Sequence, residues 1–354
     1  MRYVLSFLLF GFWPAIAVAL DCSSNGYFVG AQTATYNGQR FTNMTISVSG
    51  GAPGINTNGK SGVIIDTVLV YHTNGSVGIL QQGSGGAEIH NAHVYGYKGA
   101  SLPGANIACR NASGIWVTNT KVEGGQRGIE INHCNNSTLQ KIEGANQTGV
   151  LGEGAGAFVQ WMNSSSGLLQ DFYNFRPKAP TQLFTEGDVV NIYRSNGITI
   201  TNGLIDGVYG DPNDPNEGIV SCGVQNDEYT NNTTVSGVTV FNSIDGAFCA
   251  FGTGGTGNIF KNVHANKNLC SDPITGKPPS SGNGYMFVGP CTKNKTTCVA
   301  GPKGVTFTNA SGSTYQNWTP CQGDSNPVYN MPAFKPKPAG IAYAPQIRAT
   351  NICN

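Results

Sequence analysis

Three stretches of the chain repeat one pattern: Ser113-Gly-Ile-Trp-Val-Thr-Asn119, Asn196-Gly-Ile-Thr-Ile-Thr-Asn202 and Ser236-Gly-Val-Thr-Val-Phe-Asn242. Each begins with a small or polar residue and glycine, continues with alternating β-branched or apolar positions, and ends in or near asparagine. Alternation with a period of two is typical of a strand that buries one face. Glycine and asparagine tolerate positive φ and therefore mark sharp bends. The pattern predicts short strands separated by tight bends.

Two further patterns follow several of these copies. One is an apolar residue, an acid and glycine, as in Val122-Glu-Gly and Ile205-Asp-Gly, and the other is a third short strand, as in Gly128-Ile-Glu-Ile. Successive copies begin about 20 to 30 residues apart, which is typical of a solenoid. A β-sandwich or barrel would instead need Asn-Gly or Asp-Gly turns that join mirrored strands. We therefore predict an all-β fold, a single-stranded right-handed parallel β-helix with projecting loops, whose recurring corner asparagines stack.

This repeat pattern resembles the secreted pectate-lyase-like β-helix superfamily over residues 40 to 312. The resemblance implies a polysaccharide-binding groove formed by one parallel sheet and its overhanging loops. The Asn-Thr-Asp, Asp-Asp, Gly-His-Gly and Arg-Ile-Lys motifs of polygalacturonases and the Arg-x-Pro-x-x-Arg motif of pectate lyases are absent from the sequence. Tyr209-Gly-Asp-Pro-Asn-Asp is similar to the Tyr-Gly-x-Asp-Pro-His-Glu motif of alginate epimerases, but it is one residue shorter and lacks the histidine.

Composition and the first residues bound the class and compartment. The 354 residues carry 20 Lys and Arg against 19 Asp and Glu, with 39% hydrophobic residues, which excludes a disordered chain. No basic run offers a site for nucleic acid. Residues 1–19 combine Arg2, an apolar run and Ala17-Val-Ala19, which predicts a cleaved signal peptide. We expect a secreted, extracellular protein without a membrane segment after cleavage: a β-helix domain over residues 20–312, then a disulfide-tethered extended tail over 313–354.

Cysteines and glycosylation motifs agree with secretion. The ten cysteines form no Cys-x-x-Cys pair, so we expect disulfides, with Cys291 and Cys298 a plausible local loop. The chain is also rich in Asn-x-Ser/Thr acceptors for N-glycosylation. The predicted sites are Asn43, Asn74, Asn111, Asn136, Asn146, Asn163, Asn232, Asn294, Asn309 and Asn317.

Candidate catalytic residues come from aligning the third strand of each repeat. The position just before the strand then holds Arg127, Asp188, Glu217 and Asp245. Equivalent residues of neighbouring coils lie about 4.8 Å apart in a parallel ladder, so the three acids would form a column of interacting carboxylates. Such a column suits general acid and base catalysis. The alternative is a set of ordinary solvated turns, because an apolar residue, an acid and glycine also form turns.

Neighbouring segments supply candidate substrate-binding residues. Arg127 and Lys267 would contact charged substrate groups, and Arg176 lies in an aromatic stretch where sugars can stack. His264 could abstract a proton, as lyases and epimerases require. Tyr209 begins the loop that also holds Asp211 and Asp214, for which Ca²⁺ binding and an acidic turn both remain open.

The sequence thus predicts a secreted polysaccharide-active enzyme, a lyase or a glycoside hydrolase, that uses carboxylates on one face of the β-helix. The alternative is a non-catalytic β-helix that binds glycan, as a cell-wall or effector protein. In either case the expected partner is an extracellular polysaccharide, the expected state is a monomer, and no cofactor beyond Ca²⁺ is implied.

Overall fold

The computed structural model describes residues 27–83, 85–96, 104–147, 156–175, 188–208, 222–243, 246–250, 254–266, 286–288, 305–308 and 314–315. These residues form strands, turns and bends, and no helix occurs among them. The predicted signal peptide lies outside this part of the chain. So does the predicted tail, except that Thr314–Tyr315 form a strand that pairs with the preceding coil.

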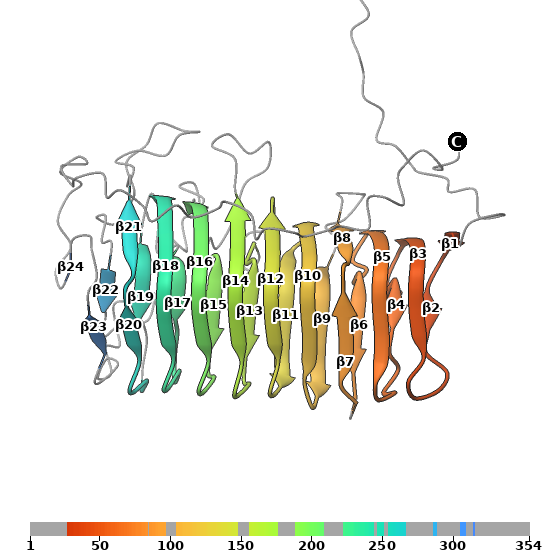
Figure 1. Ribbon diagram of the computed structural model, residues 1–354, viewed down its shortest axis with the longest axis horizontal. Helices are drawn as coiled ribbons and strands as arrows, with labels where there is room; N and C mark the ends of the chain where they lie inside the picture. The colour runs from red at the N-terminus through yellow and green to blue at the C-terminus, as the bar shows by residue number, and fades with distance from the viewer. Residues whose placement is uncertain are drawn as a thin grey trace, which may run out of the picture.

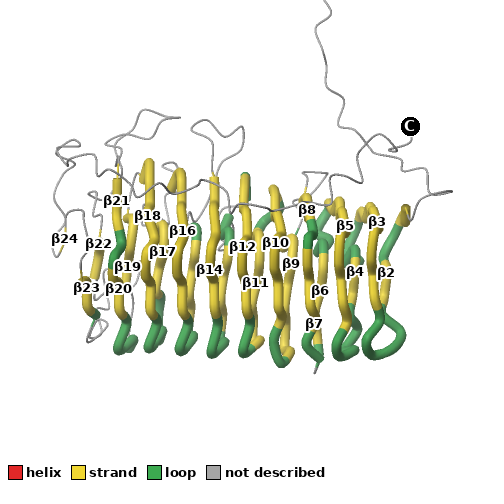
Figure 2. Tube along the Cα trace, in the orientation of Figure 1, coloured by secondary structure: helices red, strands yellow, loops and turns green. Residues whose placement is uncertain are grey.

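The strands form two sheets (Figures 1 and 2). The 13-stranded sheet, sheet A, contains β1 (Tyr27–Val29), β3 (Arg40–Ser49), β5 (Val63–Thr73), β7 (Ala87–His90), β8 (His93–Gly96), β10 (Ile115–Gly124), β12 (Thr138–Ala145), β14 (Leu168–Phe175), β16 (Thr199–Val208), β18 (Thr234–Ser243), β20 (Ile259–Lys261), β21 (His264–Asn266) and β23 (Thr306–Thr308). The 11-stranded sheet, sheet B, contains β2 (Gln32–Thr33), β4 (Ile55–Asn56), β6 (Ile79–Gln82), β9 (Ala105–Ala112), β11 (Arg127–Cys134), β13 (Val159–Met162), β15 (Val190–Tyr193), β17 (Cys222–Asn226), β19 (Gly246–Ala250), β22 (Met286–Val288) and β24 (Thr314–Tyr315).

The chain winds alternately through the two sheets. Each strand of sheet A pairs in parallel with the sheet A strand of the next coil, and the strands of sheet B do the same, as β10 with β12 and β11 with β13 show. Figure 1 shows the coils stacked in chain order along one axis. The predicted all-β parallel solenoid is confirmed.

A single residue bends each long strand of sheet A. The residue directly after the second outward position has positive φ in every described coil from β3 to β21, so the strand changes direction there without losing its pairing. These residues are Asn43, Thr67, Asn91, Asn119, Lys141, Asp171, Asn202, Gly237 and Asn262. Two of the three strands predicted per repeat are therefore the two halves of one bent strand.

The bend residues are linked from coil to coil. Asn119 Nδ2 donates to Asn91 Oδ1 at 3.3 Å, and Asn91 Nδ2 donates to Asp66 Oδ1 at 2.8 Å. Asn202 donates to Asp171 in the same way. The predicted stacking of corner asparagines is confirmed at Asn91 and Asn119, whereas the other two links end on the aspartates Asp66 and Asp171. Because asparagine adopts positive φ at low cost, one side chain provides both the bend and the link at these asparagines.

The core is a stack of inward side chains. In the first halves of the sheet A strands, one inward position per coil is buried, with exposed fractions of 4% or less, from β3 to β20. It is occupied by Phe41, Ile65, Ile89, Val117, Leu139, Leu169, Ile200, Val235 and Phe260. Burying one such side chain stabilises a fold by about 1.5–3 kcal/mol, so the repeated apolar position contributes to the stability of every coil.

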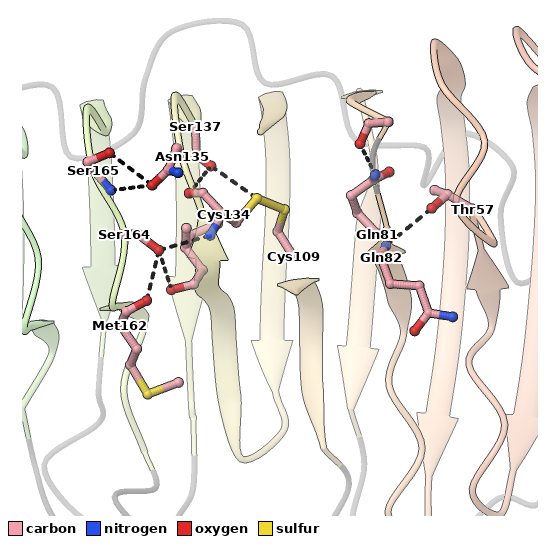
Figure 3. The surroundings of a disulfide bond; sticks show 12 residues. Thr57, Gln81, Gln82, Cys109, Cys134, Asn135, Ser137, Met162, Ser164 and Ser165 are labelled. Carbon is pink, nitrogen blue, oxygen red and sulfur yellow. Dashed lines mark hydrogen bonds between the residues drawn. A yellow bond between two sulfur atoms is a disulfide. The ribbon is translucent and has the colours of Figure 1, made fainter. Parts of the chain in front are cut away.

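Two disulfides each join successive coils. Cys109 pairs with Cys134 and Cys222 with Cys249, with Cα–Cα distances of 6.0 and 6.1 Å. Beside the first, polar corner residues connect the coils further, since Asn135 Oδ1 accepts from the Ser165 backbone N–H at 2.8 Å (Figure 3). The disulfides indicate an oxidising environment. The remaining six cysteines lie outside the described residues.

Candidate functional site

Arg127 and Asp188, two of the predicted site residues, lie at the start of sheet B strands. Arg127 Nη1 lies 3.5 Å from Glu130 Oε2. The Asp188 carboxylate accepts hydrogen bonds from Asn191 Nδ2 and from the Cys222 backbone N–H, both at 2.8 Å. Both charged groups are therefore engaged by neighbours in or next to their own sheet.

The coil register differs from the alignment made on sequence. Asp188 lies two residues before Val190, which pairs with Val224, and the corresponding position of the next coil is Cys222. Cys222 in turn pairs with Gly246. The segment before β17 contains more residues than the alignment on sequence allows for. The residues equivalent to Asp188 in the next two coils are therefore Cys222 and Gly246. Glu217 and Asp245 lie outside the described residues, and their catalytic roles remain predictions.

His264 lies on the other sheet. It follows the bend in its coil and pairs with Thr239 of β18, and burial lowers the pKa of its imidazole. The structure therefore does not bring His264 to the face that holds Arg127 and Asp188. The other predicted site residues fall outside the described residues, namely Tyr209, Arg176, Lys267, Asp211 and Asp214.

Seven predicted glycosylation sites lie among the described residues, and all seven asparagines have positive φ. They are Asn43, Asn74, Asn111, Asn136, Asn146, Asn163 and Asn232. Five of them are exposed, while Asn74 and Asn146 are half-buried. These asparagines therefore lie where the backbone turns sharply, although only Asn43 is one of the bend residues of sheet A. Their glycosylation remains a prediction. Asn294, Asn309 and Asn317 lie outside the described residues.

The outward face of sheet B carries a buried polar row. Glu130, Gln160, Asn191 and Gln225 occupy equivalent positions of successive coils, and their exposed fractions lie between 3% and 9%. Glu130 forms a two-point ion pair with Arg110, with Nε–Oε1 and Nη2–Oε2 distances of 2.8 and 2.9 Å. A carboxylate held at two points by a guanidinium suits a structural role.

Sheet A presents a richer set of groups beyond the bend. We call the outward side chains of this half the post-bend face; it comprises Thr45, Ser47, Leu69, Tyr71, His93, Tyr95, Lys121, Glu123, Glu143, Ala145, Tyr173, Phe175, Leu204, Asp206, Thr239, Phe241 and His264. At its centre, strand register pairs His93 with Lys121 and Lys121 with Glu143, and it pairs Tyr95 with Glu123. We call these five residues the acid–base cluster.

One ammonium group connects the two carboxylates of the cluster. Lys121 Nζ lies 2.9 Å from Glu123 Oε2 and 3.8 Å from Glu143 Oε1. Glu123 Oε2 also lies 3.4 Å from His93 Nε2. The Glu143 side chain is 7% exposed and those of Lys121 and Glu123 are 20% and 24% exposed, so these charges interact partly shielded from water.

Within the acid–base cluster, the pKa values of Glu123 and Tyr95 are shifted in opposite directions. The hydrogen bond from His93 lowers the pKa of Glu123 to about 2, with burial opposing this shift and Lys121 adding to it. Burial, together with the Glu123 charge, raises the pKa of the Tyr95 phenol, and Lys121 opposes that change. Glu123 is therefore ionised and Tyr95 protonated over the whole physiological range. Opposed shifts among neighbouring groups are a feature of acid–base sites.

Aromatic rings flank the cluster on both sides along the solenoid axis. On the N-terminal side, Tyr71 and Tyr95 pack edge to face with ring centroids 6.0 Å apart. On the C-terminal side, Tyr173 and Phe175 lie nearly parallel, 15° apart, with centroids separated by 6.5 Å. Burial and the charges of Asp206 and Glu143 raise the pKa of Tyr173 to about 12, so its hydroxyl stays a hydrogen-bond donor. Rings with an apolar face and a polar edge suit sugar binding.

Sequence analysis misses this cluster because it seeks a column of acids only before the third strand of each repeat, whereas these acids lie in the pattern of an apolar residue, an acid and glycine. Glu123 and Glu143 come from Val122-Glu-Gly and Ile142-Glu-Gly, which continue the bent strand. Counting from the bend would have found them. Lys121 and Glu123 are the second and fourth residues after Asn119, and both positions face outward because side chains alternate along a strand.

No metal site emerges from the part of the chain that the structure describes. There, no group of three or more His, Cys, Asp or Glu side chains is arranged to hold a metal ion. The search for membrane spans covered the same residues and found no helix long and apolar enough to cross a bilayer.

Comparison with known proteins gives distant structural likenesses. No family model matches the chain, and no curated protein matches it. Among solved structures, it is similar to the catalytic domain of a GH87 α-1,3-glucanase in complex with nigerose, a β-helix enzyme, at 10% identity and a TM-score of 0.38. The match covers 81% of this chain and 59% of the glucanase chain. A match to QnrB1, a plasmid-mediated fluoroquinolone resistance protein, has 13% identity and a TM-score of 0.22, and covers 61% of this chain and 91% of that chain. Neither likeness assigns a reaction.

Proposed function

We propose that the protein is a secreted polysaccharide-active enzyme, in the wider pectate-lyase-like superfamily, whose chemistry takes place at the acid–base cluster. The observation that carries this proposal is the contact of Lys121 Nζ with both Glu123 and Glu143 on a face flanked by aromatic rings. Glycoside hydrolysis uses a pair of carboxyl groups. Histidine, lysine and tyrosine are among the side chains that can act as general acid or base in other cleavage reactions such as β-elimination.

Each group has a distinct role in this proposal. Glu123, held ionised by His93 and Lys121, accepts a proton or stabilises positive charge on the sugar ring. Glu143, whose side chain is 7% exposed and lies 3.8 Å from the Lys121 ammonium, is the second carboxyl of the pair that glycoside hydrolysis uses. Lys121 is a positioning residue that holds both carboxylates toward the same point.

A binding protein without catalytic activity is the second candidate. The aromatic pairs favour it, because Tyr71–Tyr95 and Tyr173–Phe175 would hold a sugar chain without any chemistry. In that case the charged cluster would only order the face. The two candidates differ in whether new chain ends appear on incubation with a polysaccharide.

The test is an activity screen with matched variants. Purified protein is incubated with plant, algal and microbial polysaccharides, and reducing ends and unsaturated uronide absorbance are followed. We expect Glu123→Gln and Glu143→Gln each to lower the rate by about 10²–10⁴-fold, the range for loss of an acid or base. Glu88→Gln is the control, since Glu88 belongs to the same sheet but precedes the bend and contacts His90.

Two results would reject the proposal. If the protein binds a polysaccharide but produces no new ends from any substrate, the binding-protein alternative holds. If activity is present and is abolished by Asp188→Asn, Glu217→Gln or Asp245→Asn but not by Glu123→Gln, the active site lies with the residues predicted from sequence. Thermal unfolding of each variant checks that lost activity does not reflect lost folding.

A further inference from the structure

We infer that the substrate is an uncharged polysaccharide chain that lies along the solenoid axis over the post-bend face and is hydrolysed at internal bonds. This inference rests on the proposed function and names its substrate class and binding direction. Three observations carry it: the charges of the face, the order of aromatic and ionisable groups along the axis, and the separation of the two carboxylates.

The charge of the post-bend face disfavours a polyanion. Among its described residues, three are acids, Glu123, Glu143 and Asp206, and one, Lys121, is a lysine or arginine. The Lys121 ammonium already contacts both glutamates, so its charge is balanced within the cluster and does not attract a substrate carboxylate. A uronic acid unit would meet net negative charge there, and repulsion between like charges in a partly shielded site is costly.

The chain segments that follow these strands have the same charge balance. Residues 97–103, 148–155, 176–187 and 209–221 lie outside the described residues, and their sequence contains five acids and three bases: Glu153, Glu186, Asp211, Asp214, Glu217, Lys98, Arg176 and Lys178. An uncharged glycan, which binds through hydroxyl groups and ring faces, avoids this repulsion.

The order of groups along the axis indicates the direction of the chain. Tyr71 and Tyr95 are in directly paired positions of β5 and β8, the charged residues follow on β10 and β12, and Tyr173 and Phe175 follow on β14. Successive coils are about 4.8 Å apart, so these groups extend over roughly four coil spacings. A sugar chain that contacts both aromatic pairs must run along the axis and pass over the cluster. It is then cut between its bound parts, which is internal cleavage.

The separation of the carboxylates agrees with hydrolysis. Because one nitrogen lies 2.9 Å from Glu123 and 3.8 Å from Glu143, the contacting oxygens are at most roughly 7 Å apart, and this upper bound overlaps the separations of about 5 to 9.5 Å used in glycoside hydrolysis. A protonated carboxyl of the pair gives its proton to the glycosidic oxygen as the bond from that oxygen to the anomeric carbon breaks. Water supplies the new oxygen on the anomeric carbon and transfers a proton to a carboxylate, so that one water is consumed per bond.

The experiment compares uncharged and acidic polymers directly. Wild type, Glu123→Gln and Glu88→Gln are incubated with soluble α- and β-glucans, a mannan and a xylan, and with polygalacturonate and alginate. Reducing ends, unsaturated uronide absorbance, and product length by size-exclusion chromatography are recorded. We expect new ends from at least one uncharged polymer, none from the acidic ones, no uronide absorbance, and an early fall in mean chain length.

Each other outcome overturns the inference. Cleavage of an acidic polymer that Glu123→Gln abolishes rejects the uncharged substrate while the proposed function stands. Release of single terminal sugars without a fall in mean chain length rejects binding along the axis. If no polymer is cleaved, the proposed function fails together with the inference.

A second measurement tests the aromatic pairs independently of chemistry. Tyr71→Ala and Phe175→Ala should raise KM for long chains by tenfold or more and leave kcat within about twofold, because they remove binding but not the reacting groups. Tyr36→Ala is the control, since Tyr36 is 61% exposed and lies outside the post-bend face. Equal KM values in all three variants would contradict the proposed path of the chain.

Discussion

The properties of Glu123 depend on the two side chains that contact it. The hydrogen bond from His93 is the largest cause of its lowered pKa, and Lys121 contributes further. The contact with His93 cannot be predicted from the local sequence, because His93 is thirty positions away in the chain and meets Glu123 only through the coil register. Lys121, by contrast, lies two residues before Glu123 on the same strand. The acid itself could be predicted from the alternation after Asn119, whereas its protonation state could not.

The pH dependence of activity should follow from the His93 contact. With a pKa of about 2, Glu123 stays ionised in weak acid, so it does not limit activity at pH 4. In His93→Phe the carboxyl loses its main stabilising partner and its pKa rises toward the ordinary value, so the acid limb of kcat/KM should move to higher pH. A pH–rate profile measures this. His90→Phe, which removes a contact to Glu88 instead, should leave the limb in place, and an unchanged limb in His93→Phe would refute the assignment.

His72 gives a corresponding prediction for stability. It is fully buried, and its ring nitrogens lie 2.8 Å from the Ser76 carbonyl oxygen and 2.6 Å from Asn106 Oδ1. Burial lowers its pKa, although the two hydrogen bonds oppose the shift. The unfolded chain therefore binds the proton more tightly. The contribution of His72 is complete above about pH 6.5 and is lost as pH falls through the lower folded-state pKa.

Unfolding midpoints in denaturant measured between pH 7.5 and 4.5 would test this prediction. The wild type should lose stability progressively below about pH 6.5. His72→Gln should be less stable at pH 7.5 by about 1–3 kcal/mol, because a buried polar contact is perturbed, but its stability should depend less on pH over this interval. A wild type that is equally stable across the range would contradict the account of His72.

At the scale of the strand, alternation and bends explain most of what sequence could predict. The inward stack from Phe41 to Phe260 follows from period-two apolarity, and the bends follow from Asn, Gly and Asp. The register before β17 could not be predicted, because the intervening segment has no strand pattern with which to count residues. Thr67 and Lys141 also adopt positive φ. Their positions in the stack of bend residues explain this conformation, whereas their residue types do not.

Close packing inside a coil predicts the effect of adding one carbon atom. A Cβ on Gly203 would overlap the ring of the buried Phe172 in the adjacent coil, whereas a Cβ on Gly51 would meet no atom within 4 Å. Gly203 has no positive φ, so the cost is steric. We expect Gly203→Ala to lower the free energy of unfolding by about 1–3 kcal/mol and Gly51→Ala to change it little. Equal unfolding midpoints for the two variants would show that Phe172 moves aside freely.

At the scale of the whole molecule, stability is a sum over neighbouring coils, because each coil contacts only the next. The two disulfides reinforce such contacts at Cys109–Cys134 and Cys222–Cys249, with sequence separations of 25 and 27 residues. The cysteines predicted an oxidised framework, but pairing depends on register and could not be read from spacing. Closing a loop of this size stabilises a protein by roughly 3 kcal/mol.

The disulfide variants test this sum over coils. Cys222→Ser with Cys249→Ser should lower the free energy of unfolding by about 2–4 kcal/mol without loss of the β signal in circular dichroism. Cys222 lies on sheet B, where its backbone N–H donates to Asp188. Activity at the post-bend face, which belongs to sheet A, should therefore persist below the new unfolding midpoint. Complete loss of activity in a folded double variant would show that the two faces are not independent.

The most direct test of the account is the rate of polysaccharide cleavage by Glu123→Gln beside Asp188→Asn and Glu88→Gln, on whichever polymer the wild type cleaves. The account predicts a loss of about 10²-fold or more for Glu123→Gln and wild-type rates for the other two. A full rate in Glu123→Gln together with a large loss in Asp188→Asn would contradict it and assign the chemistry to sheet B.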